Sequence, residues 1–367
     1  MSSWSGGAPR YRLRVAEPRF RFMVVLAAVM TVATILVCSV QGLPIRDPDD
    51  DSLGPAYVRF PLFLLAAFLC DVLPRMVQRH RREDEGYVAS FRAVLNERWR
   101  SSQVRFMFIG LAGWYVTYAT FRNLKNAVPF VNGSLWDDTM ERLDHTLWLG
   151  HDPATVLHAV FGQGVAASVF SLIYVAWIAL IPLTLMWALV WSRNHALGSW
   201  FVTAFAVDWA LGAATYFAFP TLGPIYSEAD TFAGLRETTV TSLQGSMIAD
   251  HSLVLSDPTG HHALQSIAAF ASLHVGLTVT MCLLVELAGA RRSLRLLAWS
   301  FLALTSLATV YLGWHFFVDT LGGAVVGAAA VWVAALATGN HVGWRPRLMR
   351  DPVETLSDVS PRVSAQH

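Results

Sequence analysis

Long uninterrupted apolar stretches constrain this chain more than any other feature of its sequence. Several reach about 20 residues, the length that an α-helix needs to cross roughly 30 Å of hydrocarbon. The composition agrees with them, because 54% of the 367 residues are apolar, only 14% are charged and the mean hydropathy is +0.44. Soluble domains carry about a quarter charged residues. The sequence therefore predicts a polytopic membrane protein and excludes a disordered chain, a coiled coil and a disulfide-stabilised scaffold.

The apolar stretches predict about eight transmembrane spans in an all-α helix bundle, with the catalytic core in the later helices. The spans are expected at 22–40, 58–73, 104–121, 165–191, 196–219, 267–287, 296–312 and 316–337. The second span is the weakest, because it is short and contains Pro61. A short helix at the membrane interface is predicted over 153–162, where Asp152 supplies an N-cap and Pro153 the first helical position.

Basic residues are distributed unevenly between the two sides of this bundle. If the N-terminus is cytoplasmic and the spans alternate, 21 of the 27 Lys and Arg residues lie on the cytoplasmic side. The positive-inside rule favours this orientation, which makes both termini cytoplasmic and puts 123–163 and 220–266 outside. The basic segment 74–103 is then cytoplasmic, either as a solvated connector or as a surface that contacts anionic lipid.

The predicted topology divides the chain into three parts. They are an N-terminal unit with two spans and the basic segment (1–103), a membrane domain (104–340) and a disordered cytoplasmic tail (341–367). The net charge of +1 gives no indication of a nucleic-acid partner. Cys38, Cys70 and Cys282 lie in apolar stretches, so we expect buried thiols rather than disulfides or a zinc site. The sequence does not specify an oligomeric state.

Six ionisable side chains lie within or at the edges of the predicted spans, where charge is costly and often functional. They are Asp71, Asp208, His274, Glu286, His315 and Asp319. Asp71 and Glu286 lie at cytoplasmic helix ends, where we expect structural roles. Asp208 lies near the middle of a span, and both a hydrogen-bonded contact within the bundle and a role on the substrate side fit it.

His274, His315 and Asp319 are expected to meet at the outer membrane face. His315 and Asp319 are four residues apart, so on a helix they share a face. The carboxylate can then orient one imidazole nitrogen and leave the other free to react. Two histidines and a carboxylate fit a nucleophile, its orienting partner and a separate general acid or base. The alternative, that each histidine is only a bundle contact, does not account for the whole set at one face.

The motifs around these residues resemble those of a known enzyme family. Ser272-x-His274-x-Gly276 and Tyr311-x3-His315-x3-Asp319-x2-Gly322 are similar to the second and third signature motifs of the type-2 phosphatidic acid phosphatase superfamily. The resemblance implies that His315 is phosphorylated, that Asp319 activates it and that His274 protonates the leaving group. The first superfamily motif, Lys-x6-Arg-Pro, is absent.

Weaker matches resemble the inositol phosphorylceramide synthase-like branch, in which that first motif is also missing. Asp144-x2-Leu147-x2-Gly150-x2-Pro153 matches a motif of the branch, as do Ser272-Leu273-His274 and an arginine, Arg122, at the outer end of an earlier helix. The turn 220–224 is similar to a Pro-rich turn of the branch, but lacks the second proline of its Pro-Pro pair.

Four further residues are candidates for substrate binding: Arg122, Asp144, Ser272 and Tyr311. Arg122 either binds phosphoryl oxygens in a bidentate manner or anchors its helix at the headgroups. Lys125, one turn later, ranks behind it. Tyr311 either hydrogen-bonds within the site or belongs to the interfacial aromatic belt. Gly323 and Gly327 form a Gly-x3-Gly pattern that predicts close helix packing.

No metal or other cofactor is predicted, because the loop histidines His251, His261 and His262 lack ligand spacing and a carboxylate cluster. The sequence thus predicts a membrane phosphotransferase that acts on a lipid-linked phosphate ester, a phospholipid or a polyprenyl phosphate, with a hydroxyl acceptor. Inositol phosphate transfer is what the resemblance implies. The alternative is a lipid or polyprenyl (pyro)phosphate phosphatase with water as acceptor. A transporter is disfavoured, because broken helices and inverted repeats are not evident.

Overall fold

Helices account for most of the fold, as the apolar stretches predict. The computed structural model of the chain describes residues 20–48, 56–260, 264 and 267–349. The helices are α1 (Arg21–Gln41), α2 (Ala56–Glu83), α3 (Tyr87–Arg98), α4 (Ser101–Val131), α5 (Asp137–Leu147), α6 (Pro153–Phe161), α7 (Val165–Met186) with its π-helical continuation η1 (Trp187–Trp191), α8 (His195–Ala218), α9 (Pro224–Ser227), α10 (Ala229–Phe232), α11 (Thr239–Ser256), α12 (Leu273–Leu287), α13 (Arg292–Tyr311) and α14 (Phe317–Thr338).

Six of the described helices are long and apolar enough to cross a membrane. They are α1, the Pro61–Glu83 part of α2, α7 with η1, α8, α13 and α14. The chain is therefore a multi-pass integral membrane protein with an all-α fold. The predicted span at 104–121 lies within α4, which is not among the six. Glycine, threonine and aromatic residues make α4 less apolar, and they pack it against α1 and α8.

The predicted span at 267–287 is wrong over its first six residues. The helix α12 begins only at Leu273, and its 15 residues extend about 22 Å, less than the thickness of the hydrocarbon core. The backbone N–H groups of Ala269 and Phe270 donate to the carbonyl and hydroxyl of Thr221 (3.0 and 2.8 Å). These tertiary bonds replace helical ones, so the segment before His274 is not helical.

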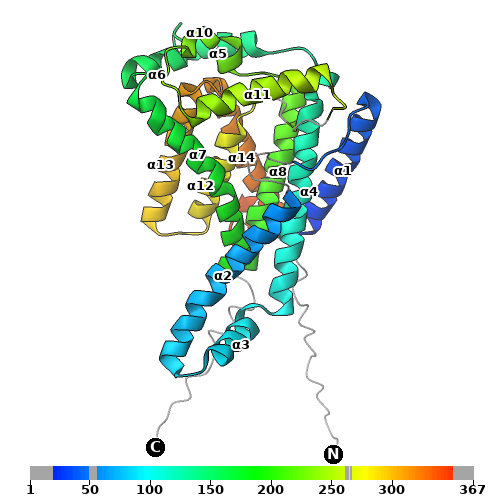
Figure 1. Cartoon of the computed structure of the whole chain (residues 1–367), viewed down its shortest axis with the longest axis vertical. Helices are drawn as coiled ribbons and strands as arrows, with labels where there is room; N and C mark the ends of the chain where they lie inside the picture. Colours follow the sequence, from blue (N-terminus) through cyan, green and yellow to red (C-terminus); the bar gives the residue numbers. More distant parts are fainter. Residues whose placement is uncertain (1–19, 49–55, 261–263, 265–266, 350–367) are drawn as a thin grey trace, which may run out of the picture.

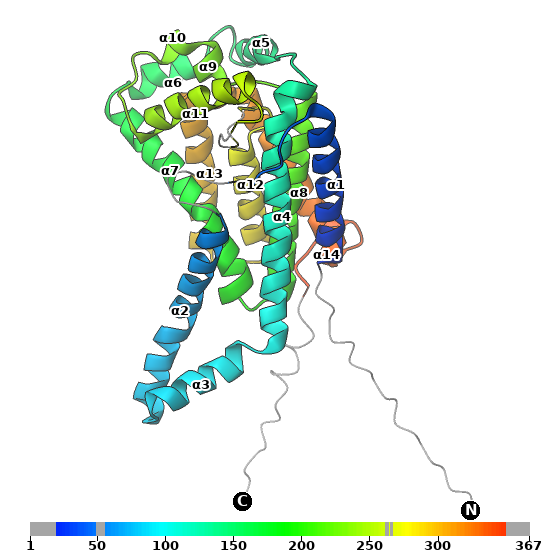
Figure 2. The ribbon, with the colours of Figure 1, turned by 45° about the vertical axis from the view of Figure 1, so that its right-hand side comes forward.

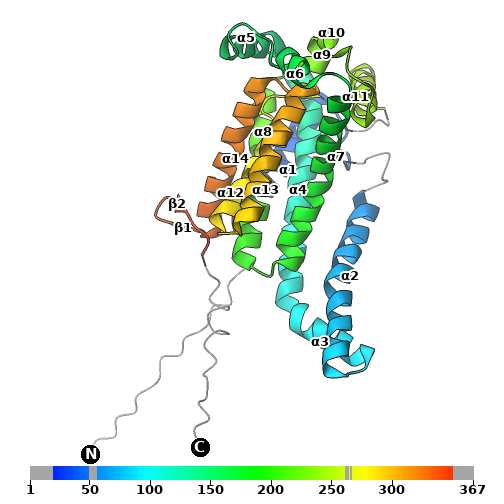
Figure 3. The ribbon, with the colours of Figure 1, turned by 90° about the vertical axis from the view of Figure 1, so that its left-hand side faces the viewer.

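The helix α2 also differs from the predicted second span, since it continues to Glu83. The Trp191 indole at the end of η1 donates to the carbonyl of Ala67, in the middle of α2 (3.1 Å). The second half of α2 and the helix α3 extend beyond the bundle (Figure 1, Figure 3). Asp71 has the structural role expected of it, because its buried carboxylate accepts two bonds from Arg98 (2.9 Å each) and one from Arg75 (2.6 Å).

The helix α8 forms the centre of the bundle, with α4, α12 and α14 packed around it and α1 beside α4 and α8 (Figure 2). Small residues on α8, such as Ala204, Ala206 and Gly212, allow these neighbours to approach closely. Asp208 is fully buried on α8 and accepts a hydrogen bond from the Thr280 hydroxyl of α12 (2.8 Å). Of its two interpretations, the structure favours the contact within the bundle.

The glycines of α14 pack directly against α12, which confirms the Gly-x3-Gly prediction. A Cβ atom at Gly323 would lie 2.2 Å from the Ser272 carbonyl oxygen, and one at Gly327 would lie 2.2 Å from that of Gly276. Real Cβ atoms do not approach that closely, so only glycine allows this distance between the two helices. The close packing brings the first turn of α12 alongside the first turn of α14.

Short helices cover one end of the bundle. The two long predicted loops contain α5 and α6, and α9, α10 and α11, and we call these five helices the helical cap (Figure 1). The short helix predicted over 153–162 is confirmed as α6, whose N-cap Asp152 accepts from the Thr155 N–H (2.8 Å). Residues 341–346 form a small antiparallel hairpin of β1 (His341–Val342) and β2 (Arg345–Pro346), so the expected disorder is wrong there. The rest of the predicted tail, 350–367, lies outside the described residues.

Candidate active site

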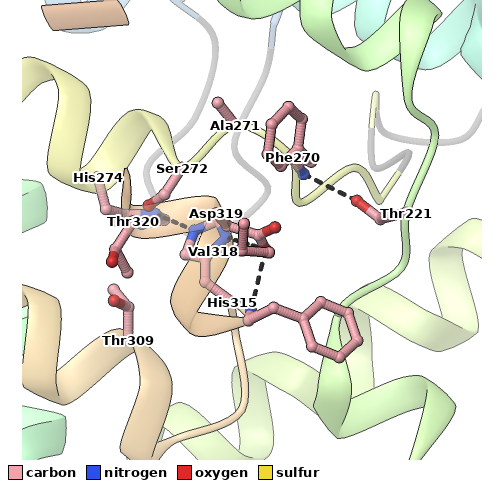
Figure 4. Close-up of polar contacts among 12 residues, drawn as sticks. Thr221, Phe270, Ala271, Ser272, His274, Thr309, His315, Val318, Asp319 and Thr320 are labelled. Carbon is pink, nitrogen blue, oxygen red and sulfur yellow. Dashed lines mark hydrogen bonds and ion pairs between the residues drawn. The ribbon is translucent and has the colours of Figure 1, made fainter. Parts of the chain in front are cut away.

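Two histidines from neighbouring elements face each other below the helical cap. His274 lies on the first turn of α12, and His315 lies in the short connection between α13 and α14 (Figure 4). Nδ1 of His274 and Nε2 of His315 are 3.1 Å apart. On its other side, Nδ1 of His315 is 3.4 Å from the Oδ2 atom of Asp319. The structure thus brings together the three residues that the sequence singled out.

The order of these contacts favours one distribution of protons over the two rings. A proton on Nδ1 of His315 would face the Asp319 carboxylate, although the separation of 3.4 Å is longer than a hydrogen bond. Nε2 of His315 would then accept from Nδ1 of His274. In this assignment His315 presents a lone pair, and His274 holds a proton beside it.

A sharp turn before α14 orients His315. Gly313 has φ +74° and ends α13 in the left-handed conformation that glycine adopts most readily. The backbone N–H groups of Trp314 and His315 both donate to the Thr309 carbonyl (2.9 and 3.3 Å). His315 is only 4% exposed, so its ring has little freedom to move.

Aromatic residues of α7 enclose His274. The ring centroids of Trp177 and Tyr174 are 4.3 and 4.9 Å from that of His274. The Trp177 indole donates to the Thr278 hydroxyl (2.9 Å) and to the His274 carbonyl (3.1 Å). Neither residue is among the candidates that the sequence motifs indicate. Their signal was the three-residue spacing of Tyr174 and Trp177, which puts both on one face of α7.

Ser272 and Tyr311 make structural contacts. Ser272 is buried at the N-cap of α12, where its hydroxyl accepts from the Val275 N–H (3.4 Å). Tyr311 is fully buried, and its hydroxyl donates to the Gly162 carbonyl (2.5 Å) at the end of α6. Both hydroxyls are therefore already bonded within the protein.

Asp144 lies on α5 and bonds to the backbone next to His315. Its two oxygens accept from the N–H groups of Phe317 (2.6 Å) and Val318 (2.8 Å) in the first turn of α14. Burial raises the pKa of Asp144 to about 6, although these two bonds favour the ionised carboxylate. Asp137, two turns earlier, accepts in the same way from the N–H groups of Leu222 (3.0 Å) and Gly223 (2.8 Å).

Two cationic residues approach the site from α4. The Arg122 guanidinium donates to the Tyr118 hydroxyl (3.0 Å) and to the Leu264 carbonyl. The Lys125 ammonium lies 5.5 Å from the centroid of the Tyr216 ring of α8. Lys125 therefore faces the central helix of the bundle, which its sequence neighbours did not indicate.

An acidic pocket opens from the helical cap toward His315. Its volume is about 10 Å³, the room of about one water molecule. Its carboxylates come from separate segments, and its inner wall includes His315 and Phe316. The acidic lining residues are Glu141, Asp144, Asp152 and Glu228. Burial, followed by repulsion from neighbouring carboxylates, raises the pKa of Glu228 to about 7. Carboxylates accept hydrogen bonds from hydroxyl groups and attract cations, so the pocket favours such ligands over free anions.

Of the loop histidines, His251 is buried in α11, while His261 and His262 lie outside the described residues.

Comparison with known proteins agrees with this arrangement. The family model of the PAP2 superfamily matches residues 139–341, more than half of the chain. No curated protein and no solved structure gives a significant match. The matched segment contains His274, His315 and Asp319, together with Asp144, and it begins after α4. The chain therefore belongs to the PAP2 superfamily, whose members are phosphatases or phosphotransferases that act on lipid phosphates.

Proposed function

We propose that this enzyme transfers a phosphate-containing group from a membrane lipid to a hydroxyl acceptor through a phosphohistidine at His315. The observation that carries the proposal is the line of contacts from Asp319 to His315 to His274. It supplies an oriented nucleophile, a carboxylate that stabilises the imidazolium and a second imidazole that holds a proton.

In the first step, Nε2 of His315 attacks phosphorus and the bond from phosphorus to the leaving oxygen breaks. The leaving oxygen takes a proton from the His274 imidazolium, which becomes a neutral imidazole, and positive charge on the His315 ring is balanced by Asp319. In the second step His274, now a base, takes the proton of the acceptor hydroxyl. The acceptor oxygen attacks phosphorus, and the bond between phosphorus and nitrogen breaks. The phosphoryl group replaces the direct contact between the two rings.

Lys125 and Arg122 are the proposed ligands of the phosphoryl oxygens, whose negative charge requires donors or cations in the transition state. The position of Lys125 supports this role, since its ammonium lies 5.5 Å from the Tyr216 ring of the central helix α8. Arg122 is already bonded to Tyr118 and Leu264, so we assign it a secondary part.

The acidic pocket supports a hydroxyl acceptor. Carboxylates such as Glu141 and Glu228 accept hydrogen bonds from hydroxyl groups. The resemblance to the inositol phosphorylceramide synthase-like branch implies instead that inositol phosphate is the group transferred, so inositol would enter with the donor. The alternative is a lipid phosphatase in which water takes the place of the acceptor. The charge distribution of the connections supports an active site on the extracytoplasmic side.

The test uses the full-length enzyme in nanodiscs and two ³²P-labelled donors, phosphatidylinositol and short-chain phosphatidic acid. Rapid quenching should trap protein-bound label that is labile in acid and stable in base, as phosphohistidine is. Added myo-inositol should accelerate the loss of label from the protein, and a labelled product that contains the added inositol should form. Good turnover without bound label would contradict the intermediate. Release of labelled water-soluble phosphate at a rate that polyols do not change would favour the phosphatase.

A further inference from the structure

The amphipathic helix α5 carries two buried aspartates that contact segments far away in the sequence. Asp137 and Asp144 are seven residues apart, which puts both on the face of α5 that points into the protein. Each binds two consecutive backbone N–H groups, Asp137 those of Leu222 and Gly223 and Asp144 those of Phe317 and Val318. One short helix thus holds two separate backbone turns.

The turn held by Asp137 supports the segments that carry both histidines. Thr221 accepts the N–H bonds of Ala269 and Phe270, a few residues before His274. The N–H of Ile225 donates to the Gly313 carbonyl (2.9 Å), two residues before His315. The Leu222–Gly223 peptides between these contacts are the ones that bind Asp137.

The turn held by Asp144 is the start of α14. The first N–H groups of a helix have no partner within the helix and need acceptors from elsewhere. Asp319 accepts from Phe316 (3.0 Å), and Asp144 accepts from the next two residues. A carboxylate is also favoured there by the helix dipole. The backbone between His315 and Asp319 is therefore held by the carboxylates of Asp319 and Asp144.

We propose that α5 is a positioning clamp for the phosphotransfer site, in which Asp144 sets the His315–Asp319 geometry and Asp137 sets the turn that supports both histidine segments. The inference rests on the function proposed above. Asp144 is a positioning residue, because both of its oxygens are engaged by backbone N–H groups. Loss of the clamp should therefore slow the chemical step and leave substrate binding unchanged.

The first experiment compares Asp144→Asn and Asp137→Asn with Asp138→Asn, a matched control on the exposed face of α5. With dioctanoyl phosphatidic acid as donor, Asp144→Asn should lower kcat by roughly 10- to 100-fold, the cost of misplacing a reacting group by about 1 Å. KM should stay within about twofold, and Asp138→Asn should match the wild type. A raised KM with unchanged kcat would show instead that Asp144 binds substrate, and would overturn the clamp.

A double mutant tests whether Asp144 acts through Asp319. In an Asp319→Asn background the further loss caused by Asp144→Asn should be much smaller than in the wild type, because the two residues serve one element. Equal losses in both backgrounds would contradict the proposal. If Asp144→Asn is not monodisperse, Asp144→Glu keeps the charge but shifts the carboxylate, and it should give the same pattern with a smaller loss.

Hydrogen–deuterium exchange tests the clamp without any turnover. Peptides that cover residues 316–320 should lose protection in Asp144→Asn, and those that cover 221–225 should lose it in Asp137→Asn. Asp138→Asn should change neither. Unchanged protection in both variants would refute the clamp. If the wild type forms no phosphohistidine, the proposed function fails, whereas the exchange result still decides whether α5 holds these turns.

Discussion

At the scale of single residues, the two histidines differ in their partners and should therefore differ in their roles. Only His315 faces a carboxylate, so His315→Ala should abolish both turnover and the phosphoenzyme. His274→Ala should lose roughly 10²–10⁴ in rate but still label with p-nitrophenyl phosphate, whose leaving group needs no proton. Asp319→Asn should also lose most activity, because ring orientation and charge balance are both lost. Label that persists in His315→Ala but is absent in His274→Ala would reverse the two assignments.

A second prediction at this scale concerns the cationic side chain that binds the phosphoryl oxygens. Lys125→Met should lower kcat/KM by roughly 10²–10³, because transition-state charge on the phosphoryl oxygens loses its main counter-charge. Arg122→Gln should cost less, since that guanidinium is held by Tyr118 and Leu264. Arg142→Gln, an exposed arginine bonded only to Thr139, is the control and should have no effect. A larger loss for Arg122→Gln than for Lys125→Met would exchange their roles.

Protonation of Asp144 gives a third prediction. Its pKa is raised to about 6, so above pH 7 it is ionised and both oxygens accept N–H bonds. Below about pH 6 it is neutral and resembles asparagine, with one good acceptor. The ratio of kcat for the wild type to that for Asp144→Asn should therefore be large and constant above pH 7 and fall toward one near pH 5. The ionisable neighbours of Asp144 are the same in both proteins, so their effects largely cancel in this ratio. They are Glu141, His145, Asp152, Glu228, His315 and Asp319. A ratio that does not change with pH would contradict this role of the carboxylate.

The sequence identified some of these residues and missed others for a physical reason. The four-residue spacing of His315 and Asp319 is a local property of one helix, so it could be recognised directly. The position of Lys125 depends on how α4 packs against α8, where Tyr216 lies about 90 residues later in the sequence. The bonds of Asp144 to Phe317 and Val318 span over 170 residues. Such tertiary contacts leave no local pattern in the sequence.

At the scale of helices, the distance between α12 and α14 determines whether His274 can reach His315. Gly327→Val would place atoms where a Cβ already lies 2.2 Å from the Gly276 carbonyl, so the helices must separate. We expect a loss of about 1–3 kcal/mol in stability, typical of overpacking, and a fall in kcat as the histidines move apart. Gly245→Ala on α11, where a Cβ meets nothing within 4 Å, is the control. Thermal unfolding and kcat should respond together in Gly327→Val, and unchanged values would mean that this contact does not set the spacing.

Helix positions were predicted well where apolar length alone decides them, as for α1, α7 and α14. The prediction failed at 267–272, where Thr221 and Thr215 supply tertiary acceptors for backbone N–H groups that a helix would have used internally. It also failed for the second half of α2, whose basic residues continue the helix beyond the bundle. In both places the deciding partner lies in another part of the chain.

At the scale of the whole molecule, orientation decides which compartment supplies the acceptor. The 21-to-6 distribution of Lys and Arg predicts that α3 faces the cytoplasm and the helical cap faces outward. Single cysteines at Ala89 and Ser246, which are both exposed on these two elements, report the orientation in a Cys70→Ser background that removes the exposed native thiol. An impermeant maleimide should label Ser246→Cys on intact cells and Ala89→Cys only after permeabilisation. The opposite pattern would put the acidic pocket and His315 on the cytoplasmic side, and the acceptor would then have to be a cytoplasmic polyol.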